Sequence, residues 1–319
     1  MDKTALHIVQ SPSFSLAAKA KDFFILTKFT LSFMVVFSCV VSYLLAPNVT
    51  FNFYAVCILF IAGMLITGSA NAINQVVEKD TDILMKRTAG RPVAAGRMSQ
   101  REGWYFAIIT GAVGVVIMWK YFNIESAVIA LFSLFLYAFI YTPLKRVNSI
   151  SVLVGAFPGA LPCLIGWVAA TGLINPFAQF QGTLSNGETA TFFNYGGYIL
   201  FAIQFLWQFP HFWAIAWLAH KDYDKAGFKL LPSTKGPTRF SAVQSVIYSM
   251  FMIPVGLLPF YFNMSGALSL WILFACNIWM VYVSVLLLLK MNAASARRVM
   301  FSSYFYLMIV FLALLFDKI

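Results

Sequence analysis

The most polar stretch of an otherwise apolar chain is NAINQVVEKDTDILMKRTAGRPVAAG, residues 71–96. Within it Asn74, Glu78 and Asp82 follow one another at intervals of four. On a helix each is rotated by only about 40° from the last, so the three side chains share one face. Glu78 and Asp82 would stand about 6 Å apart along the helix axis, close enough to hold hard divalent cations jointly. The spacing predicts a cation site.

Basic residues follow this acidic face closely in the sequence, at Lys86, Arg87 and Arg91. Carboxylates beside cations suit a diphosphate, because Mg²⁺ bridges the acids to phosphate oxygens while guanidinium groups bind the remaining oxygens directly. The alternative is an ordinary basic loop between membrane spans, which explains the lysines and arginines by the positive-inside rule. That alternative does not require acids on one face. We therefore predict a metal-diphosphate site whose first metal ligands are Asn74, Glu78 and Asp82.

The composition of the whole chain points to a membrane. Of its 319 residues 61% are hydrophobic and only 10% are charged, and the mean hydropathy is +0.81. These values exclude an ordinary soluble domain and predict an all-α polytopic membrane protein. Apolar runs near the roughly 20 residues that a spanning helix needs recur along the chain. They predict about nine transmembrane helices, at 23–45, 51–75, 104–119, 124–141, 150–171, 195–218, 241–262, 267–289 and 301–316.

The basic residues predict the orientation of these spans. With a cytoplasmic N-terminus, the inner segments hold 20 of the 22 lysines and arginines, and only Lys120 and Lys318 lie outside. The net charge of +11 therefore reflects topology, and nucleic acid is not implied. Residues 1–22 lack a signal peptide and an Arg-rich presequence, so we interpret them as a cytoplasmic lead-in and favour a bacterial inner membrane. Residues 23–319 are expected to form a single polytopic domain.

A second informative stretch is LWQFPHFWAIAWLAHKDYDKAGFKLLP, residues 206–232. Pro210 is expected to break or kink a membrane helix, and His211 follows it inside the span. Ionisable residues inside spans are costly and usually functional, so His211 is a candidate for haem or substrate contact or proton transfer. The alternative is a hydrogen-bonded packing residue. Asp222 and Asp224 come next, and one of them facing the first acids would allow two Mg²⁺ ions to hold one diphosphate.

The third stretch is YAFIYTPLKR, residues 137–146, which ends the fourth span. Tyr141 can place its ring near a cavity mouth, where an aromatic face stabilises a carbocation as it does any cation. The alternative is an interfacial aromatic residue of the kind common in membrane proteins. Lys145 and Arg146 are expected to face the cytoplasm beside it. The following span is interrupted by small residues and prolines, which indicates close helix packing or room for a bulky substrate; they are Gly155, Pro158, Gly159, Pro162 and Gly166.

These motifs together resemble the intramembrane aromatic prenyltransferase superfamily, and within it the branch that farnesylates haem. The resemblance rests on N-x-x-x-E-x-x-x-D with M-K-R-T-x-x-R-P at 85–92, Y-T-P-L-K-R at 141–146, W-Q-F-P-H-F at 207–212 and K-D-Y at 221–223. It extends from about residue 24 to beyond A-R-R at 296–298. It implies a helical bundle around a central cavity open to the membrane, with acidic motifs at a cytoplasmic cap.

The resemblance also implies an activity, a cofactor and roles for the residues. Farnesyl diphosphate would donate its farnesyl group to a vinyl group of haem B, water would add to give haem O, and Mg²⁺ would be required. The implied catalytic residues are Asn74, Glu78, Asp82, Asp222, Tyr141 and His211, the metal ligands are Asn74, Glu78, Asp82 and Asp222, and the diphosphate ligands are Lys86, Arg87, Arg91, Lys145 and Arg146. One departure concerns the second acidic motif, because Asp222 is followed four residues later by Ala226.

Two alternative functions remain open at this point. In one, the acceptor is a quinone precursor or another ring. In the other, the chain is a transporter, for which we would expect two halves with matching interrupted spans, and no such repeat is evident. The expected partners are haem B and farnesyl diphosphate as substrates, the lipid bilayer, and a haem A synthase or the assembly factors of a terminal oxidase.

Overall fold

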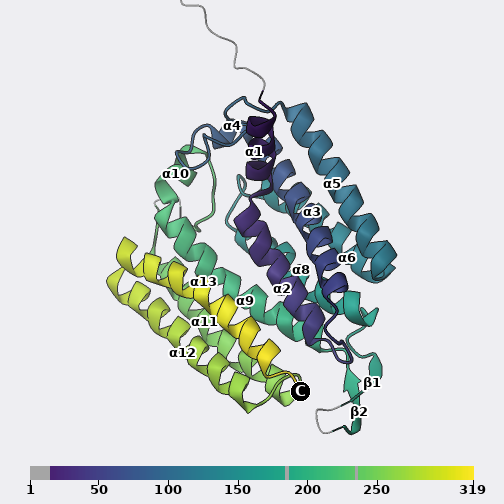
Figure 1. The fold of residues 1–319 in the computed structure, drawn as a ribbon. Coiled ribbons are helices and arrows are strands. Elements are labelled where there is room, and N and C mark those ends of the chain that lie inside the picture. Colours follow the sequence, from purple (N-terminus) through teal and green to yellow (C-terminus); the bar gives the residue numbers. More distant parts are fainter. Residues whose placement is uncertain (1–14, 184–186, 234–235) are drawn as a thin grey trace, which may run out of the picture.

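The computed structural model describes residues 15–183, 187–233 and 236–319, and it is a bundle of long helices (Figure 1). Eight helical segments among these residues are long and apolar enough to cross a membrane, or nine if one bent pair is a single span. This confirms the predicted all-α membrane fold. The eight are α3 (Phe53–Val77), α5 (Gln100–Tyr121), the run from α6 to α7 (Ile124–Leu144), α8 (Ile150–Thr171), α9 (Gly196–Leu218), α11 (Arg239–Tyr261), α12 (Ala267–Lys290) and α13 (Ala293–Phe316).

The bent pair is α1 (Leu16–Thr27) and α2 (Phe29–Leu45), which meet at an angle of 49°. The sequence predicted one span over 23–45, but the helix begins earlier and breaks at Lys28, whose backbone is left-handed (φ 49°, ψ 57°). Polar side chains of α3 satisfy the carbonyls freed by the break: Asn71 donates to Thr27 O at 3.1 Å and Gln75 donates to Leu26 O at 2.9 Å. Of the predicted lead-in 1–22, residues 1–14 lie outside the described residues.

The helices form two groups that meet at α8 and α9. Helices α2, α3, α5, α6 and α8 lie together in one group, and α9 packs against α11 and α13 in the other (Figure 1). Short elements close the end of the bundle where α3 stops, namely α4 (Lys79–Asp82) and α10 (His220–Lys225). We call this end the cap end.

Helix α8 owes its central position to small residues. A Cβ atom at Gly166 would lie 1.9 Å from the carbonyl oxygen of Cys39 on α2, and one at Gly159 would lie 2.0 Å from Gln208 Oε1 on α9. The expected close packing is therefore present. The expected interruption is not, because α8 is one helix through Pro158 and Pro162, and α9 is likewise one helix through Pro210.

The opposite end of the bundle carries a β-hairpin (Figure 1). Its strands β1 (Gln179–Thr183) and β2 (Thr189–Phe193) are antiparallel, with Gln179 opposite Phe193. None of the candidate site residues named from the sequence lies in this hairpin. The candidate site residues therefore concentrate at the cap end.

Candidate active site

The acidic residues of the first motif keep their four-residue register although the helix that carries them ends. Helix α3 stops at Val77, and Glu78 has a non-helical backbone (φ −91°, ψ 10°). The backbone hydrogen bonds nevertheless continue, from Glu78 N to Asn74 O at 2.9 Å and from Asp82 N to Glu78 O at 2.8 Å. As the spacing predicted, all three side chains line one cavity, and they are only 1%, 4% and 0% exposed.

This cavity has a volume of about 300 Å³ and lies at the cap end of the bundle. Its walls come from segments far apart in sequence: the break between α1 and α2, the end of α3 with α4 and the loop that follows, the end of the fourth span, and α8, α9 and α10. Its polar and aromatic lining consists of Lys28, Asn74, Glu78, Asp82, Arg87, Thr88, Arg91, Tyr137, Tyr141, Lys145, Phe212, Tyr223 and Phe228. We call it the acidic cavity.

Each carboxylate in the acidic cavity is paired with a cation from the predicted diphosphate set. Arg91 Nη1 lies 2.7 and 2.6 Å from the two carboxylate oxygens of Asp82. Lys145 Nζ donates to Glu78 Oε1 at 2.9 Å. Both carboxylates are buried, so these cations compensate charges that would otherwise be costly to remove from water.

The ion pairs and the burial of these groups shift the pKa values of Asp82 and Lys145. Burial raises the pKa of the Asp82 carboxyl above its usual value, and the nearby Arg91 guanidinium opposes that rise without cancelling it. For Lys145 burial acts to lower the pKa, but the negative charge of Glu78 and its hydrogen bond to Lys145 oppose burial, and the pKa lies above its usual value. Lys145 therefore stays protonated around neutral pH.

Lys28 is a further basic residue of the cavity, and none of the sequence motifs pointed to it. Its ammonium donates to Asn74 Oδ1 at 3.0 Å, so Asn74 also has a basic partner. Lys28 reaches this position because the chain breaks there and turns toward α3. The available signal was a lone lysine inside the apolar run FFILTKFTLSF, residues 23–33.

Aromatic residues lie around the same cations. Lys145 Nζ lies 4.6 Å from the ring centroid of Tyr141, which lines the acidic cavity as expected. Arg87 is exposed at the rim, where it donates to the Tyr223 hydroxyl at 3.3 Å. Tyr137 and Tyr223 were not predicted as site residues, and nothing in their spacing distinguishes them from other interfacial aromatic residues.

Several predicted residues lie outside the acidic cavity. Lys86 and Arg146 are exposed and do not line it, although Arg146 donates to Thr81 Oγ1 at 3.3 Å. Asp222 does not line it either, and Asp224 borders a separate pocket of about 120 Å³. Tyr223, between the two acids, takes the position that faces the cavity. Within the described ranges no three His, Cys, Asp or Glu side chains are grouped to hold a metal ion, so the expected two-sided clamp of acids is not assembled.

His211 does not line the acidic cavity, so its contact with haem or another substrate stays a prediction. It is 9% exposed, its Nδ1 lies 2.8 Å from Ser303 Oγ on α13, and its ring stacks on Trp207 with centroids 4.9 Å apart. The next residue, Phe212, lines the cavity instead, since one step along a helix turns the side chain by about 100°. These contacts match the alternative interpretation of His211 as a hydrogen-bonded packing residue.

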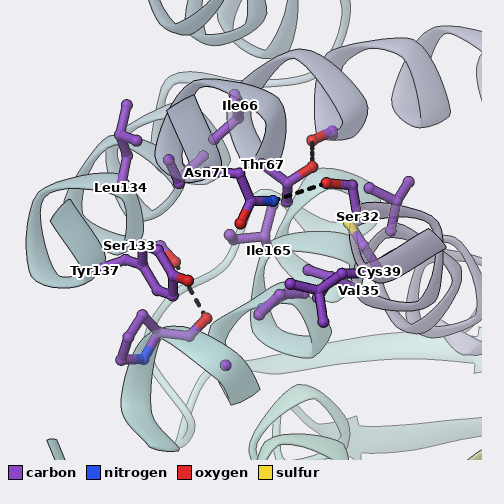
Figure 2. Close-up of a pocket in the computed structure, with 18 of the residues that line it drawn as sticks. Ser32, Val35, Cys39, Ile66, Thr67, Asn71, Ser133, Leu134, Tyr137 and Ile165 are labelled. Carbon is purple, nitrogen blue, oxygen red and sulfur yellow. Dashed lines mark hydrogen bonds between the residues drawn. The ribbon is translucent and has the colours of Figure 1, made fainter. Parts of the chain in front are cut away.

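An apolar pocket adjoins the acidic cavity deeper in the bundle. It measures about 110 Å³, lies among α2, α3, α6 and α8, and shares Leu31 and Tyr137 with the acidic cavity. Figure 2 shows Asn71 directed toward Ser32, to whose hydroxyl it donates at 3.0 Å. The hydroxyl of Ser133 donates to Pro158 O at 3.3 Å. These polar groups bond to the walls, so the space itself presents mainly carbon.

An acidic and basic cavity that leads into an apolar pocket inside a helical membrane bundle is the arrangement of an intramembrane prenyltransferase. Residues 35–313 match the model of the UbiA prenyltransferase family, and the chain belongs to that family. This membership excludes the transporter interpretation.

Two curated relatives match over essentially their whole length. The chain is 41% identical over 308 residues to the protoheme IX farnesyltransferase of Cytophaga hutchinsonii, covering 95% of this chain and 100% of that one. It is 39% identical over 323 residues to the protoheme IX farnesyltransferase of Christiangramia forsetii, covering 100% and 98%.

Two solved structures share the fold. One is a digeranylgeranylglyceryl phosphate synthase, with a TM-score of 0.73 and 19% identity, covering 94% of this chain and 98% of that one. The other is a UbiA homologue from Archaeoglobus fulgidus bound to GPP and Mg²⁺, with a TM-score of 0.59 and 14% identity, covering 92% and 99%.

Proposed function

We propose that this chain is a protoheme IX farnesyltransferase. It transfers the farnesyl group of farnesyl diphosphate to a vinyl group of haem B, and the addition of water gives haem O. The observation that carries this proposal is the full-length identity of about 40% to two proteins of that name. The cavity supports it independently, because it combines buried acids, four basic residues and an apolar extension.

The oxygen donors of Asn74, Glu78 and Asp82 hold Mg²⁺ in this proposal. Carboxylate and amide oxygens are the donors that Mg²⁺ prefers, and all three are within one cavity at the four-residue register, so the donor set fits the ion. When bound, Mg²⁺ neutralises part of the negative charge of the diphosphate. The ligand set is smaller than the sequence suggested, because Asp222 stays outside the cavity.

The cations of the cavity bind the diphosphate in this proposal. Without diphosphate, Lys145 and Arg91 are bonded to Glu78 and Asp82. Arg91, Lys145 and Lys28 line the same cavity and would bind the phosphate oxygens, and Arg87 would contribute from the rim. The same positive charges then stabilise the diphosphate as it departs, which is where negative charge accumulates in the transition state.

The farnesyl chain extends from the acidic cavity into the apolar pocket. Leu31 and Tyr137 border both spaces, so the chain passes between them. As the bond to the diphosphate oxygen breaks, the ring faces of Tyr137 and Tyr141 stabilise positive charge on the first farnesyl carbon. A vinyl carbon of haem B forms the new bond to that carbon. Water then supplies the hydroxyl group of the product, and one proton is released.

The acidic cavity lies on the cytoplasmic side of a bacterial inner membrane in this proposal. The cap end carries the loops with most of the lysines and arginines, and such loops remain in the cytoplasm. A membrane-dissolved acceptor then reaches the cavity from the bilayer, and a diphosphate made in the cytoplasm reaches it from the aqueous side. Residues 23–319 act as one catalytic unit.

The test is to incubate the purified protein in detergent with haem B, farnesyl diphosphate and Mg²⁺, with an EDTA control, and to identify the product by mass spectrometry. We expect hydroxyethylfarnesyl haem only when Mg²⁺ is present. If haem is unchanged while a quinone precursor is prenylated under the same conditions, the acceptor in our proposal is wrong and the prenyltransferase class stands.

A further inference from the structure

A groove of about 740 Å³ runs between α12 and α13 on the outer face of the bundle, away from the acidic cavity. Its walls include five aromatic side chains, among them Trp279, Phe301 and Phe305. Trp279 Nε1 donates to Ser302 Oγ at 3.0 Å, which joins the two helices across the groove. The proposed reaction uses none of these residues.

The groove is elongated along the membrane normal. On α13 it is lined from Arg297 to Ile309, and on α12 from Ala275 to Leu286. At 1.5 Å per residue the α13 side extends about 18 Å. One leaflet contributes about half of a hydrocarbon core that is roughly 30 Å thick. The groove therefore has the depth of one acyl chain, and it is long for a compact planar ring.

Two positive charges stand at one end of the groove. Arg297 and Arg298 both line it, and both are exposed. Within the described part of the chain neither arginine forms an ion pair, and both lie near the start of α13. Helix α12 ends at the cap end and α13 begins there, so the arginines lie at the level of the polar headgroups on that side.

We propose that this groove binds an anionic glycerophospholipid from the leaflet at the cap end. The phosphate is held between the guanidinium groups of Arg297 and Arg298, which suit phosphate oxygens in charge and geometry. One acyl chain lies along Trp279 and Phe305. The combination of charge complementarity and leaflet-length depth favours this occupant over a zwitterionic lipid, which lacks the net charge, and over haem, which lacks the length. The proposal does not depend on the identity of the prenyl acceptor.

The experiment is native mass spectrometry of the detergent-purified full chain with phosphatidylglycerol or phosphatidylcholine of identical acyl chains. We expect wild type to retain phosphatidylglycerol preferentially. The Arg297→Gln/Arg298→Gln variant should lose roughly tenfold or more of that affinity, because each basic residue near the surface contributes about 1 kcal/mol toward an anionic lipid. A matched control, Arg101→Gln/Lys290→Gln, removes two exposed charges from the same end but outside the groove, and should bind as wild type does.

Three outcomes would overturn the proposal. Equal retention of both lipids by wild type would show that the groove does not select charge. An equal loss in the control variant would show a general surface effect. Displacement of bound phosphatidylglycerol by farnesyl diphosphate in wild type would assign the groove to substrate. A Cys276→Trp variant fills the groove with both arginines kept, and its loss of phosphatidylglycerol tests the acyl-chain contact separately.

Discussion

Lys145 donates a hydrogen bond of 2.9 Å to Glu78, a residue 67 positions earlier, and both side chains are buried. The neighbour of Lys145, Arg146, is exposed. Two adjacent basic residues that follow the fourth span thus have different roles: one compensates an acid inside the protein and the other faces the polar surroundings. The positive-inside rule predicts both residues on the cytoplasmic side and does not show which of them is buried.

Replacing Asp82 by Asn is expected to lower kcat by at least about 100-fold, because it removes a proposed Mg²⁺ ligand and leaves Arg91 without its carboxylate. Steady-state kinetics with both substrates measures this. Asp80→Asn is the matched control, since Asp80 is exposed, lies two residues away and does not line the cavity. Undiminished turnover of a folded Asp82→Asn protein would refute the metal role.

Removal of divalent metal is expected to abolish turnover and to leave the protein folded. Arg91 and Lys145 pair with Asp82 and Glu78, so the cavity does not carry uncompensated acids when EDTA is added. We expect the melting temperature in detergent to change by less than a few degrees while product formation stops. A large destabilisation by EDTA would show that metal is a structural element of the fold.

Lys28 and Asn71 are expected to act as a unit on farnesyl diphosphate. Asn71 bonds to the carbonyl of Thr27 and thereby supports the break from which Lys28 enters the cavity. Lys28→Met and Asn71→Ala should each raise KM for farnesyl diphosphate about tenfold, since each removes or displaces one charge-assisted contact to phosphate. In the double variant the two effects should not add. Additive losses, or equal losses for haem B, would indicate independent packing roles.

His211→Ala is expected to affect stability more than catalysis. The ring bonds to Ser303 and stacks on Trp207 between α9 and α13, so its loss should cost about 1–3 kcal/mol, with KM for both substrates within about twofold of wild type. Ser303→Ala should destabilise by a similar amount. A selective loss of haem binding in His211→Ala would restore the role suggested by the sequence.

Gly166→Ala is expected to destabilise the protein by about 1–3 kcal/mol, because its new methyl group would meet the Cys39 carbonyl and force α2 from α8. Thermal unfolding in detergent measures the change. Gly90→Ala provides the control, as nothing lies within 4 Å of a Cβ atom there. Equal stability of the two variants would contradict the close contact.

Much of the architecture could be predicted because a membrane imposes simple rules. Spans were recognisable from length and apolarity, and the register of Asn74, Glu78 and Asp82 from the four-residue helical repeat. The register persisted through the end of α3 because the backbone hydrogen bonds continue there. These are local properties, and local patterns in a sequence report them well.

What escaped prediction depends on contacts between distant segments. The break at Lys28 is stabilised by Asn71 and Gln75, which belong to another helix, so the lone lysine in the run 23–45 was not enough to predict it. That Tyr223 lines the cavity and Asp222 does not depends on how α10 packs on α9. At His211 the sequence could not show that Ser303, on another helix, provides the ring with a hydrogen-bond partner.

The hydroxyl of Ser42 on α2 donates to the carbonyl of Cys163 on α8, 121 residues further along the chain. During synthesis α2 is made long before α8, since chains are extended at roughly 5–20 residues per second. For that interval Ser42 lacks its partner on α8, whereas Ser32 and Ser38 bond to carbonyls of the first span itself, at Thr27 O and Met34 O. The packing of the first span is therefore complete only after α8, in the middle of the chain, has been synthesised.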